Sequence, residues 1–201
     1  MTAMSPLLAS TVLATLFAAP AGLQNRPTQT TVASKPEQVR AQVESYLDSI
    51  DAPVRPEQWR ALGPDAAPVL EAIAQDPKKL PTRRARALAA LAVVGSPRAS
   101  KLMITIAQRE SEKSLVRMSA LRAAGQVLDP AGLVVAVKPV LEGAKDTRVR
   151  ATAAGVLAKR SPKEGCASVR TQSARENAEA RGSFARALED CDAALRLPRP
   201  E

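Results

Sequence analysis

Apolar residues recur along the chain with the spacing of amphipathic helices, and the whole arrangement then repeats. From residue 64 onward, alanine, leucine and valine stand every three or four positions, which is the spacing of one face of an α-helix. The stretches are of two alternating kinds. They predict first helices near 65–75, 97–109, 130–143 and 163–176, and second helices near 82–94, 114–127, 147–159 and 182–196.

Two residue types mark the repeat, which has a period of about 33 residues. A proline stands at the same point of each unit: Pro64, Pro97, Pro130 and Pro162, the last one residue early. An arginine follows 20 residues after each of the first three prolines: Arg84, Arg117 and Arg150. A fixed period of this length in a chain rich in alanine and leucine indicates a helical solenoid. The register of the arginines predicts that they bond between repeats.

The prolines are interpreted as helix starts. Proline suits the first position of a helix because it has no N–H and its φ is already near the helical value. A Ser or Asp directly before it can cap the free N–H groups. The chain has Ser96, Asp129 and Ser161 at these places, and Glu164 completes a capping box with Ser161, as Glu37 does with Ser34. Pro139 is expected to kink its helix.

Three segments carry a resemblance to a known family. "TRRARALAALAVVGSP", "SLVRMSALRAAGQVLDP" and "DTRVRATAAGVLAKRSP" resemble the second helix of HEAT repeats, over roughly residues 56–160. The resemblance implies an all-α, right-handed α-solenoid of stacked antiparallel helix pairs. It would occupy residues 34–198, with an N-terminal cap pair at 34–62 closed by Tyr46 and Trp59, and repeats starting near 64, 97, 130 and 162.

Composition narrows the chemistry open to the protein. Hydrophobic residues make up 45% of the 201 positions but aromatic residues only 2%, which suits closely packed helices. There is no histidine, so His-based acid–base catalysis and His-ligated metals are excluded. Some HEAT-like proteins are lyases or DNA glycosylases, but no catalytic constellation or cofactor motif appears here. We therefore expect that the protein is not an enzyme and binds no cofactor.

Charge is concentrated in the middle of the chain. The formal net charge is +9, and residues 81–175 alone contain 18 basic and 6 acidic residues. A basic middle between mildly acidic ends favours an anionic partner. The alternative is an ordinary solvated surface.

The N-terminal segment predicts export. Residues 6–22 are uncharged and apolar, too short for a typical membrane span, and end in Ala19-Pro20-Ala21, which fits a cleavage site. Residues 1–21 are interpreted as a signal peptide cut after Ala21, although 1–5 lack a basic residue. An uncleaved anchor and an apolar start without a targeting function are the alternatives. Residues 22–33 are expected to be a flexible linker, and the mature protein to be periplasmic or extracellular without a stable membrane span.

The only two cysteines, Cys166 and Cys191, are 25 residues apart in the last predicted hairpin. The predicted turn near 177–181 places them at the same height on antiparallel helices, so they can pair if their Cα atoms come within about 7 Å. In an exported protein two cysteines usually pair. We predict a structural disulfide; two separate buried thiols are the alternative.

The second helices supply the candidate binding surface, because they usually line the concave side of HEAT-type arrays. The period brings exposed positions into columns, and the predicted partner-binding residues are Arg86, Ser119, Arg122, Gln126, Thr152 and Lys159. Among them Arg86, Arg122 and Lys159 form a basic diagonal. The sequence thus predicts a non-catalytic interaction scaffold for a protein partner, with an acidic peptide as one such partner. The alternative is a binder of nucleic acid or another anionic polymer, and solvated charges without a partner remain the third reading.

Overall fold

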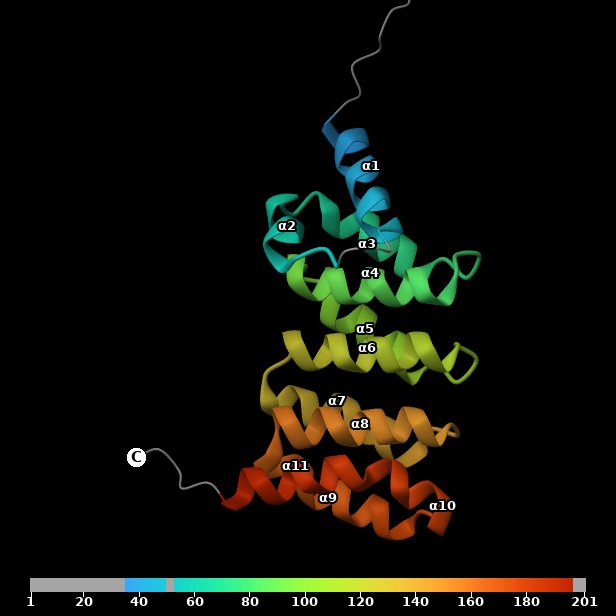
Figure 1. Ribbon diagram of the computed structural model, residues 1–201, viewed down its shortest axis with the longest axis vertical. Coiled ribbons are helices and arrows are strands. Elements are labelled where there is room, and N and C mark those ends of the chain that lie inside the picture. The colour runs from blue at the N-terminus through green and yellow to red at the C-terminus, as the bar shows by residue number, and fades with distance from the viewer. Residues whose placement is uncertain (1–34, 50–52, 197–201) are drawn as a thin grey trace, which may run out of the picture. The chain divides into compact units, whose positions relative to one another are not determined.

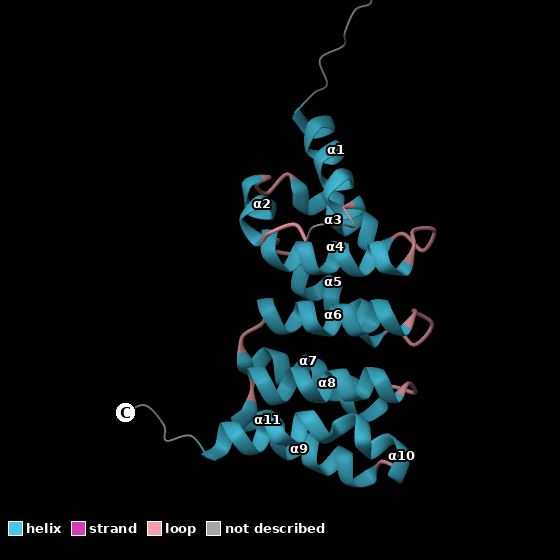
Figure 2. Ribbon diagram, viewed as in Figure 1, coloured by secondary structure: helices cyan, strands magenta, loops and turns pink. Residues whose placement is uncertain are grey.

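Helices account for nearly all of the structure described here. The computed structural model describes residues 35–49 and 53–196, and Figures 1 and 2 show helices joined by short loops, with no strand in these ranges. The predictions for residues 1–33, and the capping box expected at Ser34, lie outside the described residues. In order, the helices are α1 (Lys35–Asp48), α2 (Pro56–Ala61), α3 (Ala66–Gln75), α4 (Pro81–Val94), α5 (Ala99–Gln108), α6 (Ser114–Val127), α7 (Pro130–Gly143), α8 (Thr147–Arg160), α9 (Pro162–Arg175), α10 (Ala178–Arg181), the 3₁₀ turn η1 (Gly182–Phe184) and α11 (Ala185–Arg196).

The helices pack in consecutive pairs, as the sequence predicted. α3 packs on α4, α5 on α6, α7 on α8 and α9 on α11. Contacts then run from pair to pair along α4, α6, α8 and α11, which lie one after another in Figure 1. On the other side of the pairs, α5 contacts α7 and α7 contacts α9. The result is an all-α unit in which α4, α6, α8 and α11 share one side.

The core is built mainly from alanine, leucine and valine, and its few aromatic side chains lie near its two ends. Leu88, Leu121 and Leu157 are fully buried between the pairs. At the N-terminal end, Trp59 of α2 is buried and meets Tyr46 of α1 edge to face, with ring centroids 5.2 Å apart. At the C-terminal end, Phe184 of η1 is completely buried. No helix in the described ranges is both long and apolar enough to cross a membrane.

The interpretation of Ser-Pro and Asp-Pro as helix starts is correct for Pro130 and Pro162, which begin α7 and α9, whereas the predicted side-chain cap forms only at Asp129. Asp129 caps α7 by accepting a hydrogen bond from Gly132 N, 2.9 Å away. Ser96 instead accepts from Arg98 N before α5, which begins at Ala99. Ser161 precedes α9 but forms no capping bond, so the box with Glu164 is wrong. Its hydroxyl donates to Pro130 O at 2.8 Å, because burial directs it toward the preceding pair.

The last pair is more divided than expected. In place of one helix over 182–196, α10 is followed by η1 and then α11. Asn177 caps α10 by accepting from Ala180 N at 2.8 Å. The turn of η1 places the side chain of Phe184 in the core and begins α11 at Ala185. Pro139 is accommodated within α7, which continues to Gly143.

Arg84, Arg117 and Arg150, here called the arginine row, bond to the helix ends around them. Arg84 Nε donates to Ala74 O and Arg117 Nε to Ala107 O, both at 2.9 Å. Each carbonyl lies in the last turn of a first helix, where backbone oxygens have no partner within the helix. Arg150 Nη1 donates to Ala144 O at 2.7 Å. The row therefore satisfies carbonyl groups that the helix geometry leaves open.

Each arginine of the row also pairs with a carboxylate. Two of the three carboxylates belong to the helix pair that follows the arginine's own pair. The side chains of Arg84 and Glu112 meet at 2.5 Å, and those of Arg150 and Glu176 at 2.6 Å. These contacts confirm the predicted bonds between repeats for two positions. Arg117 bonds within its own pair, to Glu110 at 2.5 Å.

The pKa values of the carboxylates reflect these contacts. Burial alone would raise the pKa of Glu112, but the hydrogen bonds from Arg84 and from Lys113 N outweigh it, so that the pKa is lowered. The hydrogen bond from Arg150 lowers the pKa of Glu176, against the effect of burial. Both carboxylates are therefore held in the charged form.

Candidate functional site

A pocket of about 510 Å³ opens where α6, α8 and the start of α11 meet. Arg122 comes from α6, Lys159 and Arg160 from the last turn of α8, and Arg186 and Asp190 from α11. We call this the basic pocket, because four cations and one carboxylate line it. Its volume is in the range of sites that hold a small molecule or a few side chains of a peptide.

Small residues make the hollow. Gly125 of α6 lies against α8: a Cβ at this position would stand 2.8 Å from Val156 Cγ1. The absence of a side chain lets the two helices approach at the floor of the pocket. Gly155 of α8 faces open space, since nothing lies within 4 Å of its Cβ position. Ala151 and Ala187 add short apolar walls.

The cations of the basic pocket differ in how far they are engaged. Arg160 Nε donates to Gly125 O at 2.7 Å. Lys159 Nζ lies 3.7 Å from Asp190 Oδ2, an ion pair too long for a hydrogen bond, and this buried oxygen has no hydrogen-bond partner. Within 35–49 and 53–196, Arg122 and Arg186 form no hydrogen bond or ion pair. The two guanidinium groups of Arg122 and Arg186 are thus available to a ligand.

Four of the six residues predicted as a partner surface lie together in this pocket: Arg122, Gln126, Thr152 and Lys159. The Thr152 hydroxyl is already engaged, donating to Arg148 O at 2.8 Å. Ser119 is half-buried and does not line the pocket.

Arg86 needs a correction. Its guanidinium donates to Leu47 O at 2.7 Å and to Ser49 O at 2.6 Å, at the end of α1. The carbonyl groups at a helix C-terminus attract a cation, and Arg86 satisfies two of them. The predicted basic diagonal is therefore interrupted: Arg122 and Lys159 share the pocket, whereas Arg86 fastens the N-terminal helix.

Sequence reasoning missed the wall of the pocket that α11 and η1 supply. Ser183, Arg186 and Asp190 all line it, together with Arg160 of α8. The predicted columns ended at α8, because the last repeat departs from the period of 33. Extending the same columns by 33 would have reached Ala185, Leu188 and Asp192, so the period alone does not lead to Arg186 and Asp190.

The two cysteines hold that wall against its neighbour. The sulfur atoms of Cys166 in α9 and Cys191 in α11 are at disulfide distance, 2.07 Å, and the Cα atoms are 5.6 Å apart. Both residues are buried. Cys191 directly follows Asp190, so the link fixes α11 at the height of the pocket.

The groups around the basic pocket suit binding of an anion. Guanidinium and ammonium groups pair with carboxylates or phosphates, the Gln126 amide and Ser183 hydroxyl can add hydrogen bonds, and the floor is apolar. In the described residues, no cluster of three or more Asp, Glu and Cys side chains could hold a metal ion. Comparison of the chain with protein families, with curated proteins and with solved structures gives no significant match.

Proposed function

We propose that this protein is an exported, non-catalytic binding module, a small HEAT-like α-solenoid whose basic pocket holds an acidic segment of a partner protein. The observation that supports it most is the pair of unengaged guanidinium groups, Arg122 and Arg186, at the rim of a hollow with apolar walls. The period of 33 in the sequence and the stacked helix pairs favour right-handed solenoid repeats.

The mixture of groups selects the kind of segment. Four cations against one carboxylate favour a ligand with two or more negative charges. The alanine, glycine and valine walls favour one apolar side chain between those charges, since its burial removes apolar surface from water. An extended peptide with Asp or Glu around a Leu, Val or Met fits both conditions. Arg is well suited to this task because its planar group pairs with a carboxylate at two atoms.

Export is part of the proposal. The apolar segment at residues 6–22 and its small-residue end favour a signal peptide. The cysteine pair at disulfide distance is consistent with an oxidising compartment. The intact mass of protein recovered from separated cell fractions tests both: a chain beginning at Gly22 and two hydrogens lighter than the dithiol is expected. A full-length reduced chain in the cytosol would contradict export.

Selection from a random peptide library tests the ligand class even while the partner is unidentified. The full chain is expected to enrich peptides that combine Asp or Glu with an apolar residue. Arg122→Glu/Arg186→Glu should abolish their binding, whereas Arg98→Glu/Arg196→Glu, the same charge change at exposed positions outside the pocket, should retain most of it. Gly155→Leu should weaken binding without changing charge, because its side chain would fill the hollow.

The same variants distinguish the peptide proposal from its alternative, in which the basic pocket binds an anionic polymer. A polymer binder would give no enriched peptide but would bind an oligonucleotide with affinity that falls steeply with salt. Loss of that binding in Arg122→Glu/Arg186→Glu would replace the peptide proposal with the polymer. Equal loss in both charge variants would show only attraction to net charge and would reject a defined site.

A further inference from the structure

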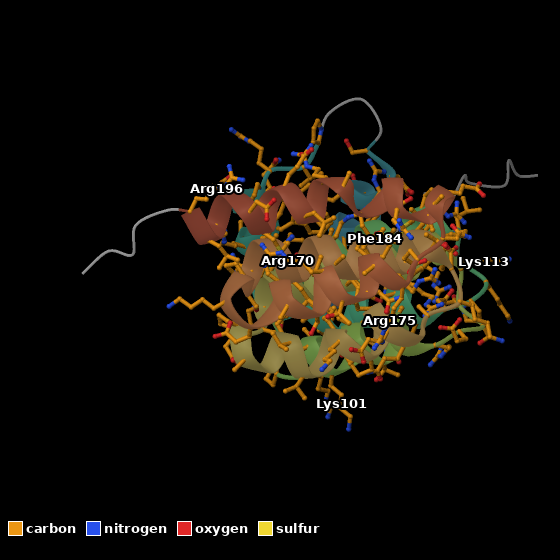
Figure 3. All side chains as sticks on the ribbon, turned by 90° about the horizontal axis from the view of Figure 1, so that it is seen from below. Lys101, Lys113, Arg170, Arg175, Phe184 and Arg196 are labelled. Atoms are coloured by element: carbon orange, nitrogen blue, oxygen red, sulfur yellow. A yellow bond between two sulfur atoms is a disulfide. The ribbon has the colours of Figure 1, made fainter. Side chains whose placement is uncertain are left out.

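A second hollow is distinct from the basic pocket. It lies on the side of the molecule where the α3–α4 and α5–α6 loops are found, whereas Arg196, the last residue of α11, lies on the opposite side. It has a volume of about 460 Å³ and is lined by the α3–α4 loop and the α5–α6 loop. We call it the loop pocket. Figure 3 shows Lys113 of this pocket and Arg196 at opposite sides of the helices.

Four cations converge on the loop pocket: Lys78, Lys79, Arg109 and Lys113. In the part of the chain that the structure describes, none of the four side chains forms a hydrogen bond or an ion pair. Three of them are exposed and Lys79 is half-buried. Holding four like charges at the mouth of one hollow is unfavourable unless a counter-ion is present.

The two glutamates of the α5–α6 loop do not serve as that counter-ion, because both are bonded to the arginine row. Glu112 lines the pocket, but its two oxygens accept from Arg84 at 2.8 and 2.5 Å. Glu110, in the same loop, is bonded to Arg117. Asp76 accepts from Lys78 N, at 2.9 Å, at the beginning of the other loop. Among the described residues, these three carboxylates thus form no ion pair with the outer cations, although Glu112 lies near enough to Arg109 to feel its charge.

The walls distinguish this pocket from the first. The loop pocket is formed by lysine, arginine, proline and serine side chains, and its one large apolar side chain, Leu80, stands 70% exposed at the rim. A ligand there meets charged groups on long side chains, so its recognition depends on charge density. Phosphate groups carry more negative charge in a given volume than carboxylate side chains do, and both Lys and Arg bind them well.

We propose that the loop pocket binds adjacent phosphate groups of a linear polyanion. The two loops approach the ligand from different helix pairs, so that neighbouring groups of one chain can each meet cations from one loop. This site is independent of the basic pocket, and its success or failure leaves the peptide proposal unaffected.

Calorimetric titration with inorganic tripolyphosphate at low salt tests the proposal on the full chain. Binding is expected, with affinity that falls linearly on a log–log plot against salt concentration. Orthophosphate should bind about tenfold or more weakly, because it offers one group instead of several. Equal affinity for the two anions, or no binding of tripolyphosphate, would overturn the proposal.

Two variants of equal charge locate the site. Lys78→Gln/Lys79→Gln/Arg109→Gln/Lys113→Gln should lower tripolyphosphate affinity about tenfold or more. Arg98→Gln/Lys101→Gln/Lys163→Gln/Arg196→Gln removes four exposed cations elsewhere, and Figure 3 shows Lys101 and Arg196 away from Lys113. Its affinity should change less than about threefold. Equal losses in the two variants would mean non-specific attraction and would contradict the proposal, as would binding to phosphatidylglycerol vesicles but not to tripolyphosphate.

Discussion

The arginines of the arginine row and those of the basic pocket differ in burial and in bonding, even where they lie on one helix. Arg84 and Arg117 are 3% and 2% exposed, and each is bonded to a backbone carbonyl and to a carboxylate. Arg122 lies on α6 like Arg117, yet it is exposed and has no such partner among the described residues. Five positions along one helix separate a structural charge from one available to a ligand.

The difference shows that the position of an arginine on its helix determines which groups its guanidinium contacts. A guanidinium that points between consecutive pairs meets the carbonyl groups at the end of a first helix, which need donors. A guanidinium on the open side of α6 or α11 meets only small residues and solvent. Charges of the first kind should therefore govern stability, and charges of the second kind should govern binding.

Removal of the most deeply paired arginine should have the largest effect. Arg84→Met removes the cation that pairs with the Glu112 side chain, 7% exposed, leaving that carboxylate only the hydrogen bond from Lys113 N, and it leaves the Ala74 carbonyl without its donor. The expected loss is about 3–5 kcal/mol of unfolding free energy, measured by urea denaturation. Arg117→Met should cost less, because Glu110 is 41% exposed and can be solvated. Arg122→Met should change stability by less than about 0.5 kcal/mol. Similar values for Arg84→Met and Arg122→Met would break the comparison.

Removal of the cysteine pair should have the next largest effect. Cys166→Ala/Cys191→Ala opens a link across 25 residues and should cost about 3 kcal/mol. Because the link joins α11 to α9, its removal should make the amides of α11 lose protection from hydrogen exchange before those of α6. A melting temperature that does not respond to a reducing agent would speak against the link.

Acid should weaken the arginine row. The pKa values of Glu112 and Glu176 are lowered in the folded protein by hydrogen bonds from Arg84 and Arg150. As pH falls below 4.5, the ordinary pKa of Glu, these carboxylates are protonated in the unfolded chain but still charged in the folded protein. The free energy of unfolding therefore falls as pH falls. Urea denaturation at pH 7, 5, 4 and 3 checks this. Arg84→Met should show a shallower fall than the wild type; an identical pH dependence would exclude Glu112 as a contributor.

Two glycines should give the smallest effects, with opposite signs. Gly155→Ala adds a Cβ to open space in the middle of α8 and should stabilise the protein by about 0.5–1 kcal/mol. Gly125→Ala should destabilise it, because its Cβ would stand 2.8 Å from Val156 Cγ1. Thermal unfolding of the two variants measures the contrast. Equal shifts would mean that α6 and α8 do not approach as closely as described.

The sequence predicted the helices better than it predicted the surface. Apolar spacing gave nearly every boundary within two residues, since burial of one helix face determines where helices form. Ser96 and Ser161 were misread because capping depends on the local turn, which a dipeptide does not specify. Arg86 was misread because its partners belong to α1, 37 and 39 positions earlier, outside the repeat.

The most direct test of the account compares binding and stability in one variant. Arg122→Met/Arg186→Met should keep the unfolding free energy of the wild type to within about 1 kcal/mol. It should also lower the affinity for an acidic peptide selected by the wild-type protein about tenfold or more. Unchanged peptide affinity, measured by fluorescence anisotropy, would contradict the assignment of the basic pocket as the binding site.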